Sequence, residues 1–418
     1  MTELSIISAA AEASDRPAIV TATRTLSFAD CARLAADAPA ATELVATPAI
    51  ETIVAIYRAL EAARPLALLH PRLAADELER QRHAVSGATI AHDQAFVLFT
   101  SGSTGRARGV VLSRAAIVAA AHASAARLGW RADDRWLLCL PLAHAGGLSI
   151  VVRCLIARMP LVLLDGDFEP SHVHALVRDH RATLASLVPT QLAALAALAG
   201  RPPQHLRAVL LGGAAAAPAL VESAVAAGWP ILPTYGLTET FGQVATATSP
   251  GGIPELLPGV TLSCHDTLHV RGPMLATAYL DGTPIAPELV TADLGTVESN
   301  RVRIAGRRDD MIVTGGEKVH PLEIEAVLAA TPGVRAACVF GIPDPRWGQV
   351  VAAALATDAS FENIAALATW HAALPAHARP RRLALVPALP QLASGKLDRQ
   401  TIAALPTVPV VYKGTVSP

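Results

Sequence analysis

The chain has 418 residues, enough for two or three domains, and a formal net charge of -1, which argues against a nucleic-acid partner. Its apolar runs are broken by charged residues, His or Pro before they reach the roughly 20 residues of a membrane span. Residues 1–15 lack the basic start and apolar centre of a secretory signal, so we expect a cytoplasmic protein. The five cysteines show no C-x-x-C spacing, so we expect neither a disulfide framework nor a zinc site.

The first part of the chain predicts a mixture of helices and strands without recognisable chemistry. We expect strands at 18–20, 25–28 and 65–69, and helices from about Phe28 and over 50–62. The apolar run 95–99 then predicts a buried strand. Ser113 is placed to cap an alanine-rich helix that ends near Gly129.

Between that strand and that helix lies a stretch rich in hydroxyls and glycines. Backbone N–H groups exposed by glycine, side-chain hydroxyls and guanidinium groups all bind phosphate oxygens. We therefore expect a phosphate-binding loop at a strand-to-helix turn, and it is not a Walker loop, which needs Lys and a hydroxyl where Arg108 and Gly109 stand. The residues concerned are Thr100, Ser101, Gly102, Ser103, Thr104, Gly105, Arg106, Arg108 and Gly109.

From residue 136 onward, apolar runs alternate with helical patterns at short intervals. This rhythm predicts an α/β fold with a mostly parallel sheet covered by helices, in which ligands bind at the carboxyl ends of the strands. The expected strands are 136–140, 161–164, 183–188, 208–211 and 231–234, and the expected helices are 147–158, 171–180, 191–198 and 218–227.

Two basic residues near these strand ends are candidates for substrate contacts. His144 stands in a glycine-flanked loop and could form a pocket wall or gate, although a lone His is more often structural. Arg153 shares a helix face with Gly146, Ser149 and Ile150. An arginine in so apolar a helix needs an anion or a buried partner, and a structural ion pair is the alternative.

Three further loops could form a nucleotide site. The small residues after 208–211 leave room for a flat ligand. In Tyr235-Gly-Leu-Thr-Glu-Thr240, Tyr235 could stack on a purine, Thr238 could contact phosphate and Glu239 could coordinate Mg²⁺. Asp293 could accept hydrogen bonds from both ribose hydroxyls.

The last third of the chain predicts two more units. Short Gly- and Pro-punctuated strands from 242 to 304 suggest a small β subdomain, and 309–405 suggest a compact α+β unit with helices near 321–330 and 361–374. Residues 406–418 read as a tail.

Five of these motifs occur in the order and approximate spacing of the adenylate-forming superfamily, which the chain resembles. The superfamily comprises acyl-CoA synthetases, peptide-synthetase adenylation domains and luciferases. Residues 141–149, 185–192 and 209–215 are most similar to the o-succinylbenzoate–CoA ligases of menaquinone biosynthesis. The five motifs are 99–110, 235–240, 291–295, Gly306-Arg-Arg-Asp-Asp-Met-Ile-Val-Thr-Gly-Gly-Glu317 and Ser394-Gly-Lys-Leu-Asp398.

The resemblance implies a large AMP-binding domain over 1–308, a small mobile domain over 309–405 that carries a catalytic lysine, and a tail. It also implies a two-step reaction. A carboxylate attacks the α-phosphate of ATP to give acyl-AMP and pyrophosphate, and the thiol of CoA then displaces AMP. The expected cofactors are ATP and Mg²⁺, with CoA as co-substrate and an aromatic carboxylic acid as substrate.

By the same resemblance, each site residue receives a role. The loop residues Thr100–Gly105 with Arg108 hold phosphates, Thr238 and Glu239 hold phosphate and Mg²⁺, and Lys396 bridges the carboxylate and the α-phosphate. The hinge is Asp309, and Gly315 and Gly316 lie beside the pantetheine arm of CoA. The nucleotide residues are Gly213, Ala214, Tyr235, Gly236, Asp293 and Arg307, and the acid-binding residues are His144, Arg153, Ser186 and Gly212.

The chain departs from the superfamily pattern in places, and several alternatives stay open. The phosphate loop usually ends Pro-Lys-Gly but here ends Ala107-Arg108-Gly109, and Ala292 replaces the glycine before Asp293. The acid could instead be a benzoate or an anthranilate, and the acyl acceptor could be a carrier protein. A homologue without ligase activity that binds acyl-CoA is a third alternative, and a homodimer is open.

Overall fold

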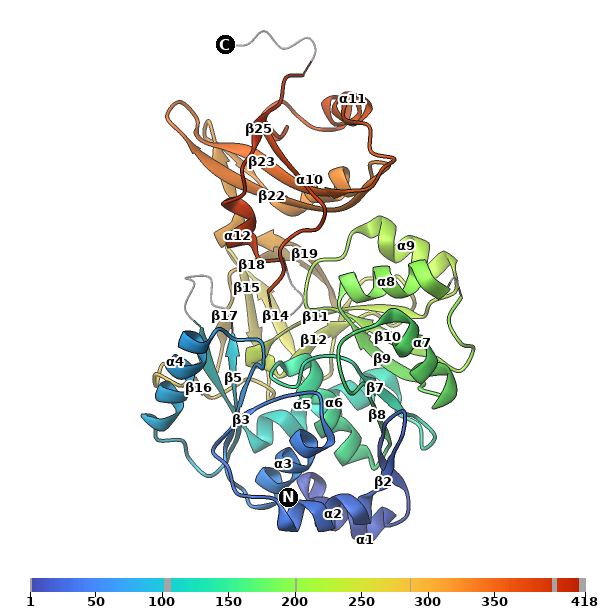
Figure 1. Cartoon of the computed structure of the whole chain (residues 1–418). Coiled ribbons are helices and arrows are strands. Elements are labelled where there is room, and N and C mark those ends of the chain that lie inside the picture. Colours follow the sequence, from blue (N-terminus) through green and yellow to red (C-terminus); the bar gives the residue numbers. More distant parts are fainter. Residues whose placement is uncertain (1, 101–106, 200, 286, 393–396, 413–418) are drawn as a thin grey trace.

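The computed structural model describes residues 2–100, 107–199, 201–285, 287–392 and 397–412. It has an α/β fold with a large N-terminal unit and a small C-terminal unit, which lies above the large one in Figure 1. None of the helices in the described part of the chain combines the length with the hydrophobicity that a membrane span needs.

The largest sheet of the N-terminal unit is parallel in its middle and antiparallel at both ends. Parallel pairing joins six neighbouring strands in the order β11 (Ile231–Leu237), β10 (Ala208–Leu211), β9 (Leu184–Leu187), β7 (Trp136–Leu138), β8 (Leu161–Leu163) and β1 (Pro17–Val20). Antiparallel β2 (Thr25–Ser27) ends the sheet beyond β1. Four antiparallel strands extend the other side in the order β12 (Gly242–Thr246), β13 (Glu255–Leu256), β19 (Arg301–Arg307) and β18 (Asp293–Glu298).

Both faces of the parallel strands are buried, as the alternation of side chains requires. Leu184 of β9 and Leu210 of β10 face a core shared with α5 (Arg114–Leu128) and α6 (Ala145–Ala157). Ala185 and Val209 face the opposite core, which α7 (Pro170–Asp179), α8 (Pro189–Ala199) and α9 (Pro218–Ala226) cover. The predicted covered sheet is thus confirmed.

A second sheet holds the strands on both sides of the hydroxyl- and glycine-rich loop. Its order is β16 (Ala278–Tyr279), β6 (Arg108–Ser113), β5 (Gln94–Thr100), β4 (Leu66–Leu69) and β3 (Glu43–Val45). β5 and β6 are antiparallel, with Thr100 opposite Arg108, so the loop closes a β-hairpin. The expected strand-to-helix turn is wrong, because the β-branched run at 110–111 continues the hairpin before Ser113 caps α5.

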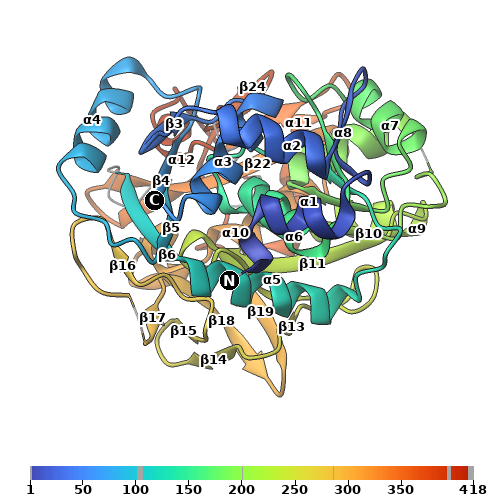
Figure 2. The same cartoon turned by 90° about the horizontal axis from the view of Figure 1, so that it is seen from below.

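The helices of the N-terminal unit surround these two sheets. Seen from below in Figure 2, α4 (Ala75–Ser86) lies at one flank and α7 at the other, with α5 and α6 between them. The helices α2 (Phe28–Asp37) and α3 (Ile50–Glu61) occur where they are expected, whereas α4 and the short α1 (Ile6–Ala13) were not anticipated.

The strands between 242 and 304 do not form one separate subdomain. Among the described strands of this region, only β14 (Thr261–Cys264), β15 (Leu268–Arg271) and β17 (Leu289–Val290) make a sheet of their own. The other strands of this region join the two larger sheets, which brings β16 and β18 to the candidate site.

The C-terminal unit has its own cores, all of whose buried members lie within residues 312–412. The sheet comprises β20 (Ile312–Thr314), β21 (Glu317–Val319), β22 (Val334–Asp344), β23 (Gly348–Thr357), β24 (Arg382–Val386) and β25 (Val408–Pro409). The helices are α10 (Pro321–Ala329), α11 (Asn363–Ala373) and α12 (Arg399–Ala403). Residues 408–412 are no tail, since β25 pairs with β24 and Tyr412 is buried in the core.

Candidate active site

Two neighbouring parallel strands, β10 and β11, carry the predicted nucleotide residues at or after their carboxyl ends. Gly212, Gly213 and Ala214 come directly after β10, and β11 runs through Tyr235 and Gly236 into the turn Thr238–Thr240. A Cβ at Gly236 would lie 1.8 Å from the carbonyl oxygen of Gly242. Only glycine therefore allows β12 to return so closely along β11.

Tyr235, Asp293 and Arg307 form one hydrogen-bonded group. Tyr235 Oη donates to Asp293 Oδ2 at 2.7 Å, and Arg307 Nη1 donates to Oδ1 at 3.0 Å from its position opposite Asp293 in the β18–β19 pair. Burial, followed by the negative charge of Asp293, raises the pKa of Tyr235, so the phenol stays a donor. Each carboxylate oxygen has a further lone pair with which it could accept a ribose hydroxyl.

Glu239 is held by a tyrosine that the sequence analysis did not single out. Tyr279 Oη donates to Glu239 Oε1 at 3.1 Å. Burial and the neighbouring carboxylate raise the pKa of Tyr279 to about 12. The Arg108 guanidinium lies over the Tyr279 ring, with Cζ 3.4 Å from the ring centroid. No local sequence signal indicates this contact, which depends on the pairing of β16 with β6.

The residues around Glu239 are compatible with Mg²⁺. In the described part of the chain, no group of three or more His, Cys, Asp or Glu side chains could hold a metal by itself. Mg²⁺ is typically bound through one or two carboxylates together with substrate phosphates. Among the described residues, none forms a hydrogen bond with Glu239 Oε2, so this oxygen could serve as such a ligand. The donor is a hard oxygen, as this ion prefers.

Arg153 is buried between α6 and the parallel sheet. It is 3% exposed, and its Nε has no hydrogen-bond partner in the described structure. Burial lowers its pKa to about 10, so it stays a cation at neutral pH. Its Cζ lies 5.2 Å from the centroid of the Trp136 ring, and Trp136 Nε1 donates to Ser186 Oγ at 3.2 Å.

The guanidinium of Arg153 lies close to the nucleotide loops. A Cβ built on Gly242, which follows the Thr238–Thr240 turn, would be 3.6 Å from Arg153 Nη2. Arg153 and Ser186 thus both contact Trp136, and Arg153 lies close to the residue that follows that turn. His144 immediately precedes α6, and its ring centroid lies 5.2 Å from that of His70.

The residue predicted as a hinge, Asp309, and the predicted glycine pair lie further along the chain. Arg307 Nη2 is 3.6 Å from Asp309 Oδ2, so one guanidinium contacts both Asp293 and Asp309. Gly315 and Gly316 have positive φ values and form the turn between β20 and β21. A Cβ at Gly315 would lie 2.8 Å from Trp347, and the ring centroid of Trp347 is 5.0 Å from Cζ of both Arg346 and Arg381.

Some predicted residues lie outside the described part of the chain, and their roles stay predictions. These are Lys396 and the loop residues Ser101, Gly102, Ser103, Thr104, Gly105 and Arg106. Their described neighbours Thr100 and Leu397 belong to β5 and to a β-bridge with Gln391.

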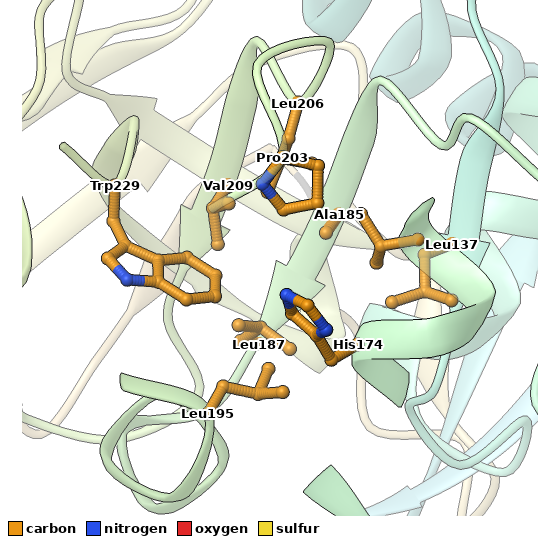
Figure 3. A pocket seen from close by; sticks show the side chains of 10 residues that line it. Leu137, His174, Ala185, Leu187, Leu195, Pro203, Leu206, Val209 and Trp229 are labelled. Carbon is orange, nitrogen blue, oxygen red and sulfur yellow. The ribbon is translucent and has the colours of Figure 1, made fainter. Parts of the chain in front are cut away.

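The cavity in Figure 3 is separate from these groups. It lies between the sheet and the helices α7 and α8, on the face opposite to α6, and aliphatic side chains with Trp229 and His174 line it. We assign it to imperfect packing of that core.

In the comparison with known proteins, two family models match two separate parts of the chain. The model of the AMP-binding enzyme family matches residues 7–273, and that of the AMP-binding enzyme C-terminal domain matches 323–396. The 2-succinylbenzoate–CoA ligase of Bacillus pumilus is 34% identical over 332 residues, which are 74% of this chain and 68% of the relative.

Solved structures agree over nearly the whole length. The o-succinylbenzoate CoA synthetase of Bacillus subtilis in complex with its acyl-adenylate intermediate superposes with a TM-score of 0.85, at 25% identity, over 97% of this chain and 99% of that one. The same enzyme with ATP and a magnesium ion gives 0.83, at 25% identity, over 95% and 98%. The chain belongs to the family of AMP-binding enzymes.

Proposed function

We propose that the protein is an ATP-dependent acid–CoA ligase that converts 2-succinylbenzoate to its CoA thioester through an acyl-adenylate. The observation that carries the choice of substrate is Arg153, a buried cation without an anionic partner in the described structure, beneath the nucleotide loops. A substrate with two carboxylates can present one to ATP and pair the other with Arg153. The names of the relatives support the same substrate.

In the first step, the chain's own residues would bind and orient the nucleotide. Asp293 and Arg307 would hold the ribose, and Tyr235 fixes the carboxylate of Asp293 by its hydrogen bond. Glu239 would hold Mg²⁺, which when bound neutralises charge on the ATP phosphates. Lys396 would stabilise the charge that develops where the acid attacks the α-phosphate.

The acid would lie between α6 and the turn that follows β11. Arg153 would pair with its distal carboxylate, with Ser186 supplying a hydroxyl, while Gly212 and His144 would form the walls. Because the site is buried, an ion pair there is stronger than in water, and an acid without the second carboxylate would leave Arg153 uncompensated.

In the second step, the CoA thiol would displace AMP after the small domain rotates about Asp309. The turn Gly315-Gly316 would pass the pantetheine arm, since glycine leaves its path open. Trp347 beside Gly315 offers a flat surface for adenine, and Arg346 and Arg381 offer cations for the phosphates of CoA.

The first experiment is ATP–pyrophosphate exchange with a panel of aryl acids, for wild type and Lys396→Ala. We expect wild type to catalyse exchange with 2-succinylbenzoate and Lys396→Ala to lose it. When free CoA is added, wild type should form the thioester. Exchange with a benzoate or an anthranilate alone would overturn the diacid assignment. A requirement for a carrier protein would overturn CoA as acceptor, and no exchange with any acid would overturn the ligase assignment.

A further inference from the structure

Residues 276–280 connect the turn that carries Glu239 to the base of the phosphate-loop hairpin. The Ala276 N–H donates to the carbonyl oxygen of Glu239 at 2.7 Å, and the Leu280 N–H donates to that of Gly109 at 2.7 Å. The segment is therefore fixed to both loops by its backbone. β16 lies within it and pairs with β6.

The side chain of Tyr279 makes a second connection between the same two loops. Its hydroxyl reaches Glu239 Oε1, while the Arg108 guanidinium covers its ring. Arg108 Nη2 is also 3.4 Å from Asp281 Oδ2, a contact between two exposed side chains. Arg108 is opposite Thr100 in the hairpin, at the base of the phosphate loop. The contacts of Arg108 with the Tyr279 ring and of Tyr279 with Glu239 therefore connect this base to the Glu239 carboxylate.

This arrangement fixes the orientation of one carboxylate. A hydrogen bond to Oε1 limits rotation of the Glu239 carboxylate, and no described residue forms a hydrogen bond with Oε2, which could then bind the metal. Mg²⁺ demands near-ideal octahedral geometry, so it discriminates strongly against a carboxylate that turns freely. Partners behind a metal ligand typically set the ligand's orientation and the affinity for the metal.

The stacked Arg108 also offers a reason for one departure from the superfamily pattern. A planar guanidinium can lie flat on a tyrosine ring and still pair with a carboxylate, whereas the ammonium group of Lys is a compact point charge. Arginine at this position therefore fits the ring below it and Asp281 beside it.

We propose that Tyr279 is a positioning residue that orients Glu239 toward the Mg²⁺ of ATP, and that Arg108 couples this orientation to the base of the phosphate loop. The inference rests on the proposed function, because it takes Glu239 as the Mg²⁺ ligand. Tyr279 itself contacts neither metal nor nucleotide in this assignment.

The test is binding of ATP by calorimetry, without any acid, in excess Mg²⁺ and in EDTA. Tyr279→Phe keeps the ring under Arg108 and removes only the hydroxyl. We expect it to weaken Mg²⁺-dependent ATP binding about tenfold, the usual consequence of losing one hydrogen bond to a charged group, and to leave binding in EDTA unchanged. Arg108→Lys keeps the charge but loses the planar contact, and it should weaken Mg²⁺-dependent ATP binding about threefold.

Tyr412→Phe is the matched control. It removes a hydroxyl that donates to the carbonyl oxygen of Pro380 at 3.1 Å in the core of the small domain, far from Glu239 in the chain. We expect its ATP binding to equal that of wild type both with Mg²⁺ and in EDTA. The Mg²⁺ concentration for half-maximal exchange should rise in Tyr279→Phe and stay constant in the control.

The outcomes separate the inference from the proposed function. Wild-type ATP binding that does not respond to Mg²⁺ would overturn Glu239 as a metal ligand, and the inference with it. A Mg²⁺ response in wild type that Tyr279→Phe retains in full would overturn the inference alone. Equal weakening with Mg²⁺ and in EDTA would also overturn it, because Tyr279 would then only support the pocket.

Discussion

Replacing Arg153 by Met separates the role of its charge from that of its bulk. Burial lowers the pKa of Arg153 from its ordinary value to about 10, which corresponds to about 3 kcal/mol against the charged form in the folded protein. Below pH 10 the side chain is protonated in both the folded and the unfolded state, so this cost is fully present at neutral pH. Only above about pH 10, where the folded state loses this proton first, does the unfolded state bind more protons, and there stability rises with pH.

The expected change in stability is therefore small or favourable. Arg153→Met removes the desolvation cost of about 3 kcal/mol and loses the contact with the Trp136 ring, worth about 1–2 kcal/mol in a buried place. A methionine fills much of the space left by the aliphatic stem. We expect a melting temperature of the ligand-free variant that is unchanged or about a degree or two higher.

Binding of the diacid should respond in the opposite direction. Loss of one partner of a buried charge pair costs about 2–4 kcal/mol, or roughly 30- to 1,000-fold in KM. The assay is ATP–pyrophosphate exchange with 2-succinylbenzoate and with benzoate, together with thermal unfolding with and without the diacid. The KM for 2-succinylbenzoate should rise while that for benzoate changes little, and the diacid should no longer raise the melting temperature.

Arg114→Met provides the control for burial of an arginine as such. Arg114 is 6% exposed, burial lowers its pKa, and it donates to the carbonyl oxygen of Leu60 at 2.9 Å. It is not among the residues that we assign to the site, so its replacement should leave the KM for the diacid unchanged. A KM that moves equally in both variants, or in neither, would refute the assignment of Arg153.

Three further changes test other parts of the structure. Asp293→Asn should weaken AMP binding about tenfold in calorimetry, because it removes the charge that Tyr235 and Arg307 hold, and unchanged affinity would contradict the ribose assignment. Arg381→Ala should raise the KM for CoA about three- to tenfold and leave ATP–pyrophosphate exchange intact, whereas a loss of exchange would speak against a CoA contact. Arg399→Met should destabilise the small domain by about 3 kcal/mol in urea unfolding at pH 7, because it leaves Glu325 buried without its partner at 2.8 Å. Burial raises the pKa of Glu325, so the folded state binds more protons and part of this loss should return at pH 5, and equal loss at both pH values would refute the explanation.

Features that depend on neighbours in the chain could be predicted from the sequence. The strands β7 to β11 are apolar runs between amphipathic helices, and this local pattern is enough to predict parallel strands covered on both faces. Tyr235 and Glu239 are close in the sequence, so a single motif indicates both. A motif that comes directly after a parallel strand lies at the carboxyl end of that strand, so the sequence also indicates the edge of the sheet at which the motif lies.

Features that depend on pairing between distant strands could not be predicted. Tyr279 reaches Glu239 because β16 pairs with β6, and Trp136 reaches Ser186 because β7 pairs with β9. Nothing in the local sequence encodes either register. The edge strand β25 is short and contains Pro409, so its composition does not indicate a strand. It is a strand because it pairs with β24.

The position of Arg307 bears on how the nucleotide site and the hinge can act together. Its guanidinium contacts Asp293 at 3.0 Å and Asp309 at 3.6 Å, and its side chain is 43% exposed. An ion pair this exposed is worth at most about 1 kcal/mol, so the longer contact with Asp309 opposes rotation of the small domain only weakly. The shorter contact joins two residues directly opposite each other in the β18–β19 pair, which belongs to the large unit. If the small domain rotates about Asp309 as we propose, losing the longer contact would cost little, and the shorter contact would stay within the large unit. The residues that we propose for the ribose would then keep their places during that movement.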